Sequence, residues 1–463
     1  MTDLSRSLEV HEVPGDLRAL AITNTGLGNT SWAVELGGRV LVVDPERDPA
    51  PYQRAAARLG GPIALVAETH LHADFVTGSP ELGATGSEVL APAGAKSEWP
   101  HRAMADEEVA ELDGWRLEAV ATPGHTPEHL SYLLSDGDRP RAVFSGGSLL
   151  VGAVARTDLI DPADTEGLTR ALWHSINHRL LSLPDDVAVF PTHGAGSFCT
   201  ASGEAKRWTT IGAERRDNPL LQASDEDEFV RRVLDGFGSY PTYFGRLRAL
   251  NRRGPRVFGV FPMLPKLTAD DVSDLRERGA TVIDTRSVAD YAEGHVAGSL
   301  SITLRPQFCS WLGWIVPDPS APLVFITDTH TDRAELVRQC LNIGYESLAG
   351  EIDLESWEAA GGDVARTHLV RPGEAVDRVV LDVRQDNEWD EGHVPGARHV
   401  ELGALAARPG AAGDGPVMTM CGHGERAATA ASLLEAGGHS DVAIFQGGPE
   451  DWARTAGDDL DQD

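Results

Sequence analysis

The stretch Thr69-His70-Leu71-His72-Ala73-Asp74 places three side chains that bind metal ions within five positions of the chain. It follows the apolar run 63–67, Ile-Ala-Leu-Val-Ala, whose length and composition predict a buried β-strand. Ligands at the end of a strand are held by a rigid scaffold and stay open to substrate. Imidazole and carboxylate ligands together suit zinc or iron. We therefore expect His70, His72 and Asp74 to lie at a metal site at the end of this strand.

Two further histidines follow in turn-like contexts, His125 in Pro-Gly-His-Thr and His193 in Pro-Thr-His-Gly. A lone histidine is more often a hydrogen-bonded core residue than a ligand, but an ordered set of this kind favours a shared ion. Three imidazoles, from His70, His72 and His125, would leave a fourth position for water or substrate, as in open catalytic sites. Asp74 and His193 would then support these ligands or form a weak second site.

This order of motifs resembles the metallo-β-lactamase fold, a four-layer αβ/βα sandwich that holds its metal at the ends of strands. The family pattern HxHxDH is matched in its first two histidines and its aspartate, and Phe75 stands in place of the last histidine. The family also has a metal-bridging aspartate in a segment that resembles TGDxLFVG. Here the segment reads Ser-Gly-Gly-Ser-Leu-Leu-Val-Gly, with Gly147 at the aspartate position. Both departures weaken the second metal position, because glycine has no side chain to coordinate an ion.

The persulfide dioxygenases, the iron-dependent branch of this family, resemble the chain in overall organisation. That branch holds iron through its first histidine, the histidine of its Gly-His-Thr motif and the bridging aspartate, a two-His-one-carboxylate face. His70 and His125 match the two histidines, and Gly147 removes the carboxylate. The resemblance therefore implies one divalent metal, Fe(II) or Zn(II), and leaves the choice between them open.

Composition limits the remaining possibilities. With 463 residues the chain should hold about three domains. Its 40 basic and 71 acidic residues give a net charge of -31, which repels nucleic-acid phosphates and anionic membranes, so we expect neither partner. Only four cysteines occur, none in a CxxC pair, which fits a reducing compartment. Residues 1–8 lack the apolar core of a signal peptide, and no apolar run is long enough to span a membrane, so we expect a cytoplasmic protein.

A repeat organises the C-terminal half of the chain. Residues 281–299 read TVIDTRSVADYAEGHVAGS, and residues 379–397 read VVLDVRQDNEWDEGHVPGA. Each copy has an aspartate after an apolar strand, an arginine two positions later, and then a Gly-His-Val motif. A further apolar strand follows, expected at 322–326 in the first copy and at 416–420 in the second, and then a helix-like segment. Strands that alternate with helices predict a small parallel α/β domain that occurs twice.

The repeat unit resembles the rhodanese domain, a sulfurtransferase fold whose active site is a C-x-x-G-x-R loop between a strand and a helix. The second copy matches in Cys-Gly-His-Gly-Glu-Arg, from Cys421 to Arg426. Backbone N–H groups at a helix N-terminus, with an arginine nearby, stabilise a thiolate. Cys421 is therefore expected to carry sulfane sulfur as a persulfide, with Arg426 stabilising anionic sulfur species. In the first copy Asp328 stands at the cysteine position and Thr331 at the glycine position, so we expect that copy to be non-catalytic.

We predict an α/β protein in three parts. The metallo-β-lactamase-like domain is expected at residues 1–250, a rhodanese-like domain without the active cysteine at 265–362, and an intact rhodanese domain at 372–463. A connector with Pro255, Pro262 and Pro265 leads into the second part. This order resembles that of the persulfide dioxygenase–rhodanese fusion enzymes, and the resemblance covers nearly the whole chain.

The resemblance implies two linked activities in sulfur metabolism. A low-molecular-weight thiol persulfide would be oxidised to sulfite at the metal, and Cys421 would transfer sulfane sulfur, which converts sulfite to thiosulfate. Two alternatives stay open. A zinc-bound hydroxide held by three histidines would suit a hydrolase that resembles glyoxalase II. With a decayed metal domain, the chain would be a sulfur carrier or sensor that works through Cys421 alone. The family resemblance also implies a homo-oligomer.

Overall fold

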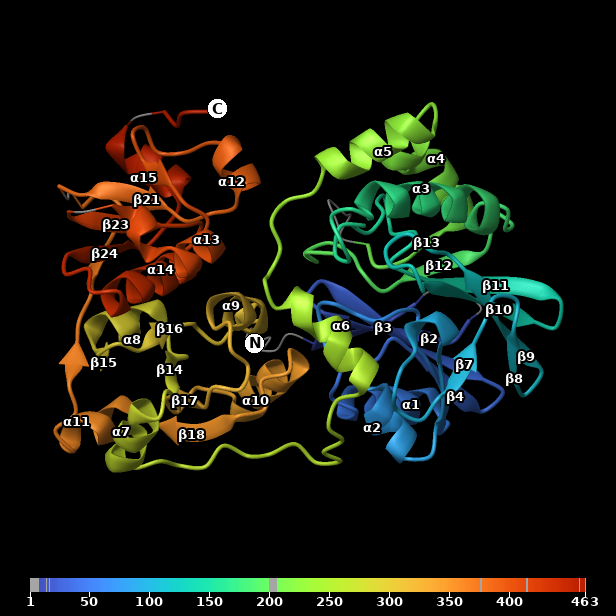
Figure 1. The fold of residues 1–463 in the computed structure, drawn as a ribbon, viewed down its shortest axis with the longest axis horizontal. Coiled ribbons are helices and arrows are strands. Elements are labelled where there is room, and N and C mark those ends of the chain that lie inside the picture. Colours follow the sequence, from blue (N-terminus) through green and yellow to red (C-terminus); the bar gives the residue numbers. More distant parts are fainter. Residues whose placement is uncertain are drawn as a thin grey trace. The chain divides into compact units, whose positions relative to one another are not determined.

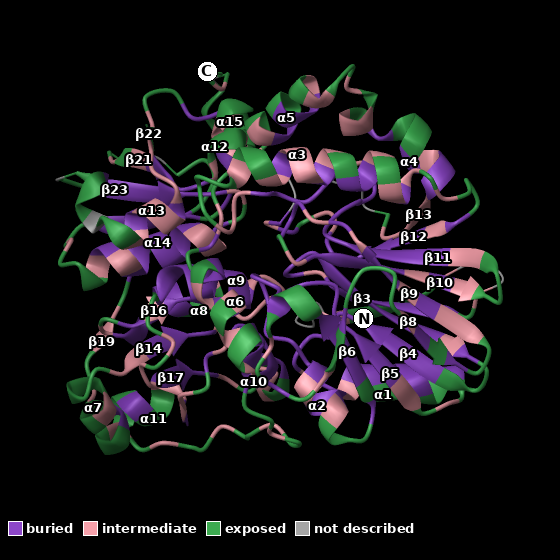
Figure 2. Cartoon of the chain, turned by 45° about the vertical axis from the view of Figure 1, so that its right-hand side comes forward, coloured by how far each residue is buried: buried purple, intermediate pink, exposed green. Residues whose placement is uncertain are grey.

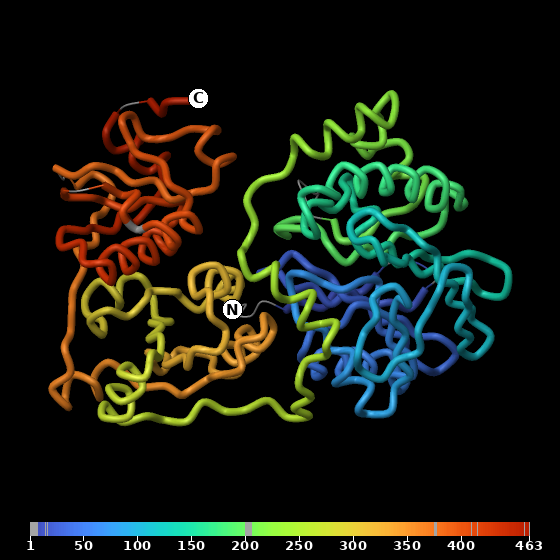
Figure 3. Tube along the Cα trace, in the orientation of Figure 1, coloured from blue at the N-terminus to red at the C-terminus, as the bar shows by residue number. Residues whose placement is uncertain are grey.

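The structure is a computed structural model that describes residues 8–13, 15, 17–199, 206–374, 377–413, 415–457 and 459–462. The N-terminal segment expected to lack a signal peptide thus lies, up to residue 7, outside the described residues. The chain forms two compact units, the first made of 1–261 with 341–344 and the second of 262–340 with 345–463. Figures 1 and 3 trace the chain through both units. Within the described ranges, no helix has the length and apolar character needed to cross a membrane.

The first unit is built on two β-sheets that lie face to face (Figure 1). One sheet has seven strands in the order β1-β2-β3-β4-β5-β6-β7, and the other has six in the order β13-β12-β11-β10-β9-β8. Their bounds are β1 (Leu8–Glu12), β2 (Ala19–Asn24), β3 (Asn29–Leu36), β4 (Arg39–Val43), β5 (Ile63–Ala67), β6 (Glu88–Pro92), β7 (Arg102–Met104), β8 (Val109–Leu112), β9 (Trp115–Ala121), β10 (Leu130–Asp136), β11 (Arg139–Gly146), β12 (Ala188–Pro191) and β13 (Thr209–Thr210). β5 confirms the strand predicted at 63–67.

The main apolar core of this unit lies between the sheets. Side chains from both sheets are buried there together, and Trp32 of the first sheet stacks on Phe190 of the second with ring centroids 4.4 Å apart. The strands are therefore covered on both faces, which explains why a strand such as β5 is apolar throughout rather than alternating. Figure 2 shows these strands as mostly buried.

Helices cover the outer face of each sheet. α1 and α2 pack on the seven-stranded sheet, and α3, α4 and α5 pack on the six-stranded sheet. The four layers confirm the predicted αβ/βα sandwich of the metallo-β-lactamase type. The helices of the unit are α1 (Ala50–Leu59), α2 (Ser79–Ala84), η1 (Ala93–Ala95), α3 (Thr165–Ser175), η2 (Ile176–Leu180), α4 (Ile211–Asp217), η3 (Pro219–Gln222), α5 (Glu226–Asp235) and α6 (Phe244–Arg253).

One edge of the sandwich gathers the loops that follow β4, β5, β9, β11 and β12. Backbone hydrogen bonds between the two sheets close this edge: Thr30 N donates to Thr192 O at 2.7 Å, and Leu130 N donates to Thr69 O at 2.9 Å. Loops that are far apart in the sequence are thereby fixed against one another. The predicted metal ligands lie on these loops.

The second unit contains two parallel sheets, one for each copy of the sequence repeat. Their strand orders are β16-β14-β17-β18 and β20-β24-β23-β21-β22, and β15 pairs with β19 separately. The strands are β14 (Thr281–Asp284), β15 (His295–Val296), β16 (Leu300–Ser301), β17 (Leu323–Ile326), β18 (Leu348–Ile352), β19 (Val364–Ala365), β20 (His368–Val370), β21 (Val379–Asp382), β22 (Arg398–His399), β23 (Val417–Met420) and β24 (Val442–Phe445). β17 and β23 confirm the strands predicted inside the repeat.

Helices flank both sheets and complete two α/β domains, as the repeat predicts. They are α7 (Ala269–Glu277), α8 (Val288–Glu293), α9 (Phe308–Ile315), α10 (Arg333–Asn342), α11 (Leu354–Ala359), α12 (Asp386–Asp390), α13 (Leu402–Ala407), η4 (Pro409–Ala412), α14 (Glu425–Ala436) and α15 (Pro449–Ala456).

The repeated Asp-x-Arg pattern has the same structural role in both copies. Arg286 and Arg384 each form an ion pair with the buried aspartate two positions earlier, at 2.6 Å and 2.8 Å. Each arginine also donates to the carbonyl of the glycine in the Gly-His-Val motif, Gly294 or Gly392, at 2.7 Å. The arginine thus ties the end of the first strand to the turn that follows the next helix. This shared structural need accounts for the pattern in both copies.

Candidate metal centre and sulfur-transfer loop

Histidines from three loops meet at the closed edge of the first unit. His70 follows β5, His125 follows β9 and His193 follows β12, and all three are buried. The ring centroid of His70 lies 4.8 Å from that of His125 and 5.4 Å from that of His193, and the latter two lie 5.2 Å apart. The structure therefore brings together residues that the sequence analysis could only group by type.

Hydrogen bonds determine which nitrogen of His125 and His193 carries the proton. His125 Nδ1 lies 2.6 Å from Arg156 O, a carbonyl that can only accept, so Nδ1 is the donor. Asn29 Nδ2 donates to Asp74 Oδ2 at 2.7 Å, which leaves Asn29 Oδ1 to accept from His193 Nδ1 at 3.0 Å. Both neutral rings therefore have their lone pair on Nε2, as in metal-bound histidines whose other nitrogen is held by an oxygen.

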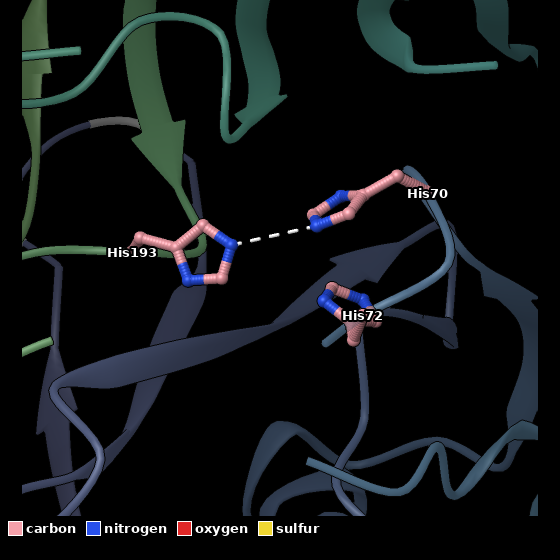
Figure 4. Close-up of side chains that lie close together, drawn as sticks. All are labelled: His70, His72 and His193. Atoms are coloured by element: carbon pink, nitrogen blue, oxygen red, sulfur yellow. Dashed lines mark hydrogen bonds between the residues drawn. The ribbon is translucent and has the colours of Figure 1, made fainter. Parts of the chain in front are cut away.

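The same reasoning applies to His70. Thr69 Oγ1 donates its proton to Asp44 Oδ2 at 2.7 Å, so it accepts from His70 Nδ1 at 2.8 Å. His70 Nε2 then has a free lone pair, and it faces His193 Nε2 at 3.4 Å (Figure 4). Two lone pairs that face each other in a buried site repel each other unless a proton or a metal ion lies between them. Tetrahedral coordination with metal–nitrogen bonds of about 2.0–2.1 Å would place two nitrogens roughly 3.4 Å apart, so the residues fit a metal ion.

Burial keeps these rings in the neutral form that binds metals. Burial, together with neighbouring imidazoles, lowers the pKa of His125 and of His193 to about 3. The pKa of His70 also lies well below its ordinary value, first because of burial and then because other histidines surround it. At neutral pH no proton has to leave these three imidazoles before they can act as ligands.

His72 has a different environment. Its Nε2 lies 3.2 Å from Asp44 Oδ1 and 3.3 Å from Glu68 Oε2. Burial alone would lower the pKa of His72, but the two carboxylates outweigh it and raise the pKa to about 10. His72 is thus an imidazolium that would have to lose its proton to bind a metal. Its ligand atom still lies within 4.8 Å of those of His70 and His193, and its role as a ligand stays a prediction.

The two remaining residues of the HxHxD motif region, Asp74 and Phe75, are both buried beside the histidines. Phe75, in place of the last histidine of the motif, is buried and stacks on the His72 ring with centroids 4.1 Å apart. Asp74, the third predicted ligand of the motif, is also buried, and its Oδ2 lies 3.5 Å from His193 Nδ1. Its Oδ1 has no hydrogen-bond partner among the described residues. Asp74 therefore holds one free carboxylate oxygen beside the histidines.

A side chain at position 147 would have no room. A Cβ on Gly147 would overlap Cδ2 of the His125 ring and lie 2.8 Å from its Cγ. His129, a residue that the sequence analysis did not single out, lies on the other side and stacks on His70 with centroids 5.0 Å apart. Its Nε2 accepts from Gly147 N at 2.9 Å and its Nδ1 lies 2.9 Å from Thr122 Oγ1, so both nitrogens have partners. His129 is thus a satisfied packing residue rather than a free ligand.

We therefore expect that restoring the family residue with Gly147→Asp will not repair the site. The new Cβ displaces the His125 ring, and such overpacking lowers the free energy of unfolding by about 1–3 kcal/mol. Gly147→Ala adds the same Cβ without a charge and should cause a similar loss in urea denaturation. Wild-type stability together with an increased metal content in Gly147→Asp would contradict the packing argument.

Two buried carboxylates near the histidines were also missed by the sequence analysis. Asp44 directly follows β4 and accepts from Thr69 N at 2.7 Å. Glu68 directly follows β5 and accepts short hydrogen bonds from the hydroxyls of Thr77 and Ser79. The signal in the sequence that could have identified them is an acidic residue directly after an apolar strand, at the end of β4 and of β5, where side chains are usually buried. These carboxylates anchor the loops after β4 and β5 and set the protonation of His72.

In the second unit, Cys421 lies in the loop between β23 and α14. Its side chain is buried, and Gly424 N donates to Sγ at 3.1 Å. Gly424 has a φ of +110°, a conformation that disfavours any residue with a Cβ. The glycine two positions before Arg426 thus allows the backbone to turn its N–H toward the sulfur. Arg426, the other residue predicted to act here, lies in the first turn of α14, directly after this loop.

Arg426 is oriented by residues that the sequence analysis did not identify. It donates two hydrogen bonds to the carboxylate of Glu388 in α12, at 2.6 Å and 2.7 Å. Its guanidinium carbon lies 5.9 Å from the centre of the Trp311 ring, which belongs to α9 of the first repeat. Glu388 and Cys421 raise the pKa of Arg426 against the opposing effect of burial, so the side chain stays cationic. A fixed positive charge therefore lies beside the cysteine.

The corresponding loop of the first repeat holds a carboxylate in the same kind of backbone cradle. Asp328 Oδ1 accepts from His330 N at 2.8 Å, from Thr331 N at 2.9 Å and from Thr331 Oγ1 at 3.0 Å. Burial would raise the pKa of Asp328, but these hydrogen bonds hold it below the usual value. The loop keeps the anion-binding geometry and lacks a thiol that could carry sulfur.

The model of the rhodanese-like domain family matches residues 268–359 and 367–455. The mitochondrial persulfide dioxygenase ETHE1 of Mus musculus is 30% identical over 203 residues, which cover 42% of this chain and 70% of that protein. A hydroxyacylglutathione hydrolase of Methylobacterium sp. (strain 4-46) is 32% identical over 205 residues, which cover 43% of this chain and 71% of that protein.

A solved structure extends the likeness beyond the first unit. The crystal structure of a metallo-β-lactamase from Staphylococcus aureus subsp. aureus COL matches with a TM-score of 0.62 at 24% identity, covering 75% of this chain and 99% of that one. At this identity the match shows the fold. Taken with the two rhodanese-like domains and the persulfide dioxygenase relatives, it establishes that the chain is an enzyme of the persulfide dioxygenase–rhodanese fusion family.

Proposed function

We propose that this enzyme oxidises a low-molecular-weight thiol persulfide at a mononuclear metal centre in its first unit and transfers sulfane sulfur at Cys421 in its second. The observation that carries the proposal is the pair of bare imidazole nitrogens, His70 Nε2 and His193 Nε2, that face each other at 3.4 Å. The presence of a rhodanese loop with its cysteine in the same chain adds the second activity. The name of the persulfide dioxygenase relative supports the choice of substrate.

The predicted ligands are His70, His72 and His125, with Asp74 and His193 beside them. When bound, a divalent iron would supply the O2 chemistry that sulfur oxidation requires. The chain itself supplies a buried site from which bulk water is excluded, and oxygen acceptors that hold each Nδ1 proton away from the centre. The rings therefore stay oriented when substrate enters.

The oxidation balances with one O2 and one water. A persulfide RSSH with O2 and H2O gives the thiol RSH, sulfite and two protons. The sulfur–sulfur bond of the persulfide breaks, the sulfane sulfur loses four electrons, and O2 accepts them. Sulfite is then available as the acceptor for the second reaction.

Sulfur transfer at Cys421 proceeds in two displacements. The Cys421 thiolate attacks the outer sulfur of a donor persulfide, whose thiol leaves, and then sulfite attacks the resulting Cys421 persulfide and leaves as thiosulfate. The Gly424 N–H at 3.1 Å from Sγ stabilises the thiolate that starts the first step and is released by the second. The cationic Arg426, fixed by Glu388, attracts the anionic sulfite.

Elemental analysis of freshly purified protein, paired with oxygen uptake on a thiol persulfide, tests the proposal. We expect a single divalent metal per chain and oxygen uptake matched by sulfite and thiosulfate. Removal of the metal with a chelator should stop oxygen uptake and leave sulfur transfer from a persulfide donor to added sulfite intact. Metal-loaded protein that takes up no oxygen with any small thiol persulfide would contradict the proposed oxidation.

A second function is favoured by one specific observation. With Gly147 in place of the carboxylate, neutral imidazoles dominate the centre, and such a set suits zinc and a metal-bound hydroxide. The hydroxyacylglutathione hydrolase relative points to the same chemistry. Zinc in the purified protein, with hydrolysis of a glutathione thioester and no oxygen uptake, would favour this hydrolase. Protein that binds no metal would favour a sulfur carrier. The cytoplasmic location and the homo-oligomeric state stay predictions.

A further inference from the structure

A buried thiol lies against the histidine cluster. Cys199 belongs to the loop that follows β12 and is fully buried. Its sulfur and the ligand nitrogens of His125 and His193 lie within 4.8 Å of one another. Two imidazoles and one thiol are therefore close enough to share a single ion. The sequence did not reveal this, because Cys199 is one of four scattered cysteines without a CxxC partner.

The position of Cys199 is fixed by the residue that also orients His125. Arg156 N donates to Cys199 O at 2.9 Å, and Arg156 O accepts from His125 Nδ1 at 2.6 Å. On its other side, Cys199 N donates to Ser197 Oγ at 3.1 Å. The backbone of Arg156 thus links the cysteine and the histidine, and the thiol is held in place rather than carried on a free loop end.

An unpaired carboxylate oxygen completes the case for a cation. Asp74 is 1% exposed, and its Oδ1 has no hydrogen-bond partner among the described residues. Asp74 interacts with the Cys199 thiol, whose pKa is raised by burial and by this carboxylate. A buried carboxylate oxygen that is paired only with a thiol is costly, and a positive ion nearby offsets that cost. These groups therefore supply the charge and the donor atoms of a metal site.

We infer that Cys199 is the anionic ligand of the metal centre and joins His70, His125 and His193, in place of the carboxylate that Gly147 cannot supply. This inference rests on the proposed metal centre and specifies its ligands. Binding converts the thiol to a metal-bound thiolate and releases its proton to solvent. A set of three imidazoles and one thiolate takes borderline or soft cations such as Zn(II), Fe(II) or Co(II) and not Mg(II) or Ca(II).

Cobalt substitution tests the assignment through a readout that does not depend on turnover. The full-length protein carries Cys421→Ser, so that the rhodanese thiol cannot contribute, and the resident metal is removed with a chelator before titration with Co(II). We expect one intense near-ultraviolet thiolate-to-Co(II) charge-transfer band. Adding Cys199→Ser should abolish the band and, because it removes a ligand, weaken Co(II) binding by more than about 100-fold. Adding Cys309→Ser, a buried cysteine of the second unit, should change neither.

The Co(II) spectrum of the Cys421→Ser protein, in which Cys199 is still present, tests the assignment by itself. A Cys199→Ser variant that fails to fold therefore does not leave the question open. Co(II) bound without a charge-transfer band overturns the thiolate assignment and leaves a histidine-based metal centre in place. Protein that binds no Co(II) overturns the assignment as well. The proposed function can fail separately from this assignment. If the cobalt form shows the charge-transfer band but the iron form of the wild-type chain takes up no oxygen with a persulfide, persulfide oxidation is contradicted. Cys199 then remains a ligand.

Discussion

Cys421→Ser should abolish the transfer of sulfane sulfur to sulfite, with a rate loss on the order of 10³-fold or more, because it removes the nucleophile. A hydroxyl cannot form the persulfide on which both displacements depend. The loop itself should persist, since serine Oγ can still accept from Gly424 N, which now donates to Sγ at 3.1 Å. Thiosulfate formed from sulfite and a persulfide donor measures the transfer, and elemental analysis should show an unchanged metal content.

The first repeat offers a matched control for this variant. Asp328→Asn changes the residue at the equivalent loop position, and the amide oxygen can still accept from His330 N and Thr331 N. We expect this variant to keep the wild-type rate of sulfur transfer, because the first loop holds no thiol. Full transfer activity in Cys421→Ser, or loss of transfer in Asp328→Asn, would refute the assignment of the two loops.

His70→Ala should remove the metal and, with it, oxygen uptake on a thiol persulfide. Changes to residues that merely orient a ligand weaken metal binding by roughly 10- to 100-fold, so loss of a ligand should cost more than about 100-fold. His70 faces His193 at 3.4 Å between Nε2 atoms and lies at the centre of the imidazole cluster. Metal analysis after dialysis and oxygen-electrode measurements check the two parts of the prediction.

Two controls separate a metal effect from general damage. His178→Ala removes an exposed imidazole from the same unit and should change neither metal content nor oxygen uptake. In His70→Ala itself, transfer from a persulfide donor to added sulfite should continue at the wild-type rate, because Cys421 belongs to the other compact unit. A His70→Ala protein that retains stoichiometric metal would show that the ion is held elsewhere.

Much of the fold follows from local patterns. The apolar run at 63–67 forms β5, and the two copies of the Asp-x-Arg and Gly-His-Val pattern form matching strands, turns and arginine ion pairs. These features depend on residues that lie close together along the chain, so periodicity and spacing predict them well. The Cys421 loop is of the same kind, since its glycines, its helix N-terminus and Arg426 all lie within a few positions.

The protonation and packing of the histidine cluster could not be predicted in this way. His72 matches the motif of a ligand, yet Asp44 from the neighbouring strand and Glu68 raise its pKa to about 10. His129 follows the predicted His125 by four positions, but only the contact with Gly147 N shows that its Nε2 is occupied. Such properties arise from side chains on different loops, whose distances no sequence pattern contains.

Local sequence is enough to predict the order of the parts, the strand that presents the HxHxD motif, and the loop that holds Cys421, because each depends on short-range patterns of apolar, glycine and charged residues. The folded structure was needed to show which histidines have free lone pairs, why a side chain cannot return to position 147, and that Cys199 lies beside His125 and His193. A buried metal centre is defined by desolvation and by hydrogen-bond partners. Both are set where the two sheets close against each other.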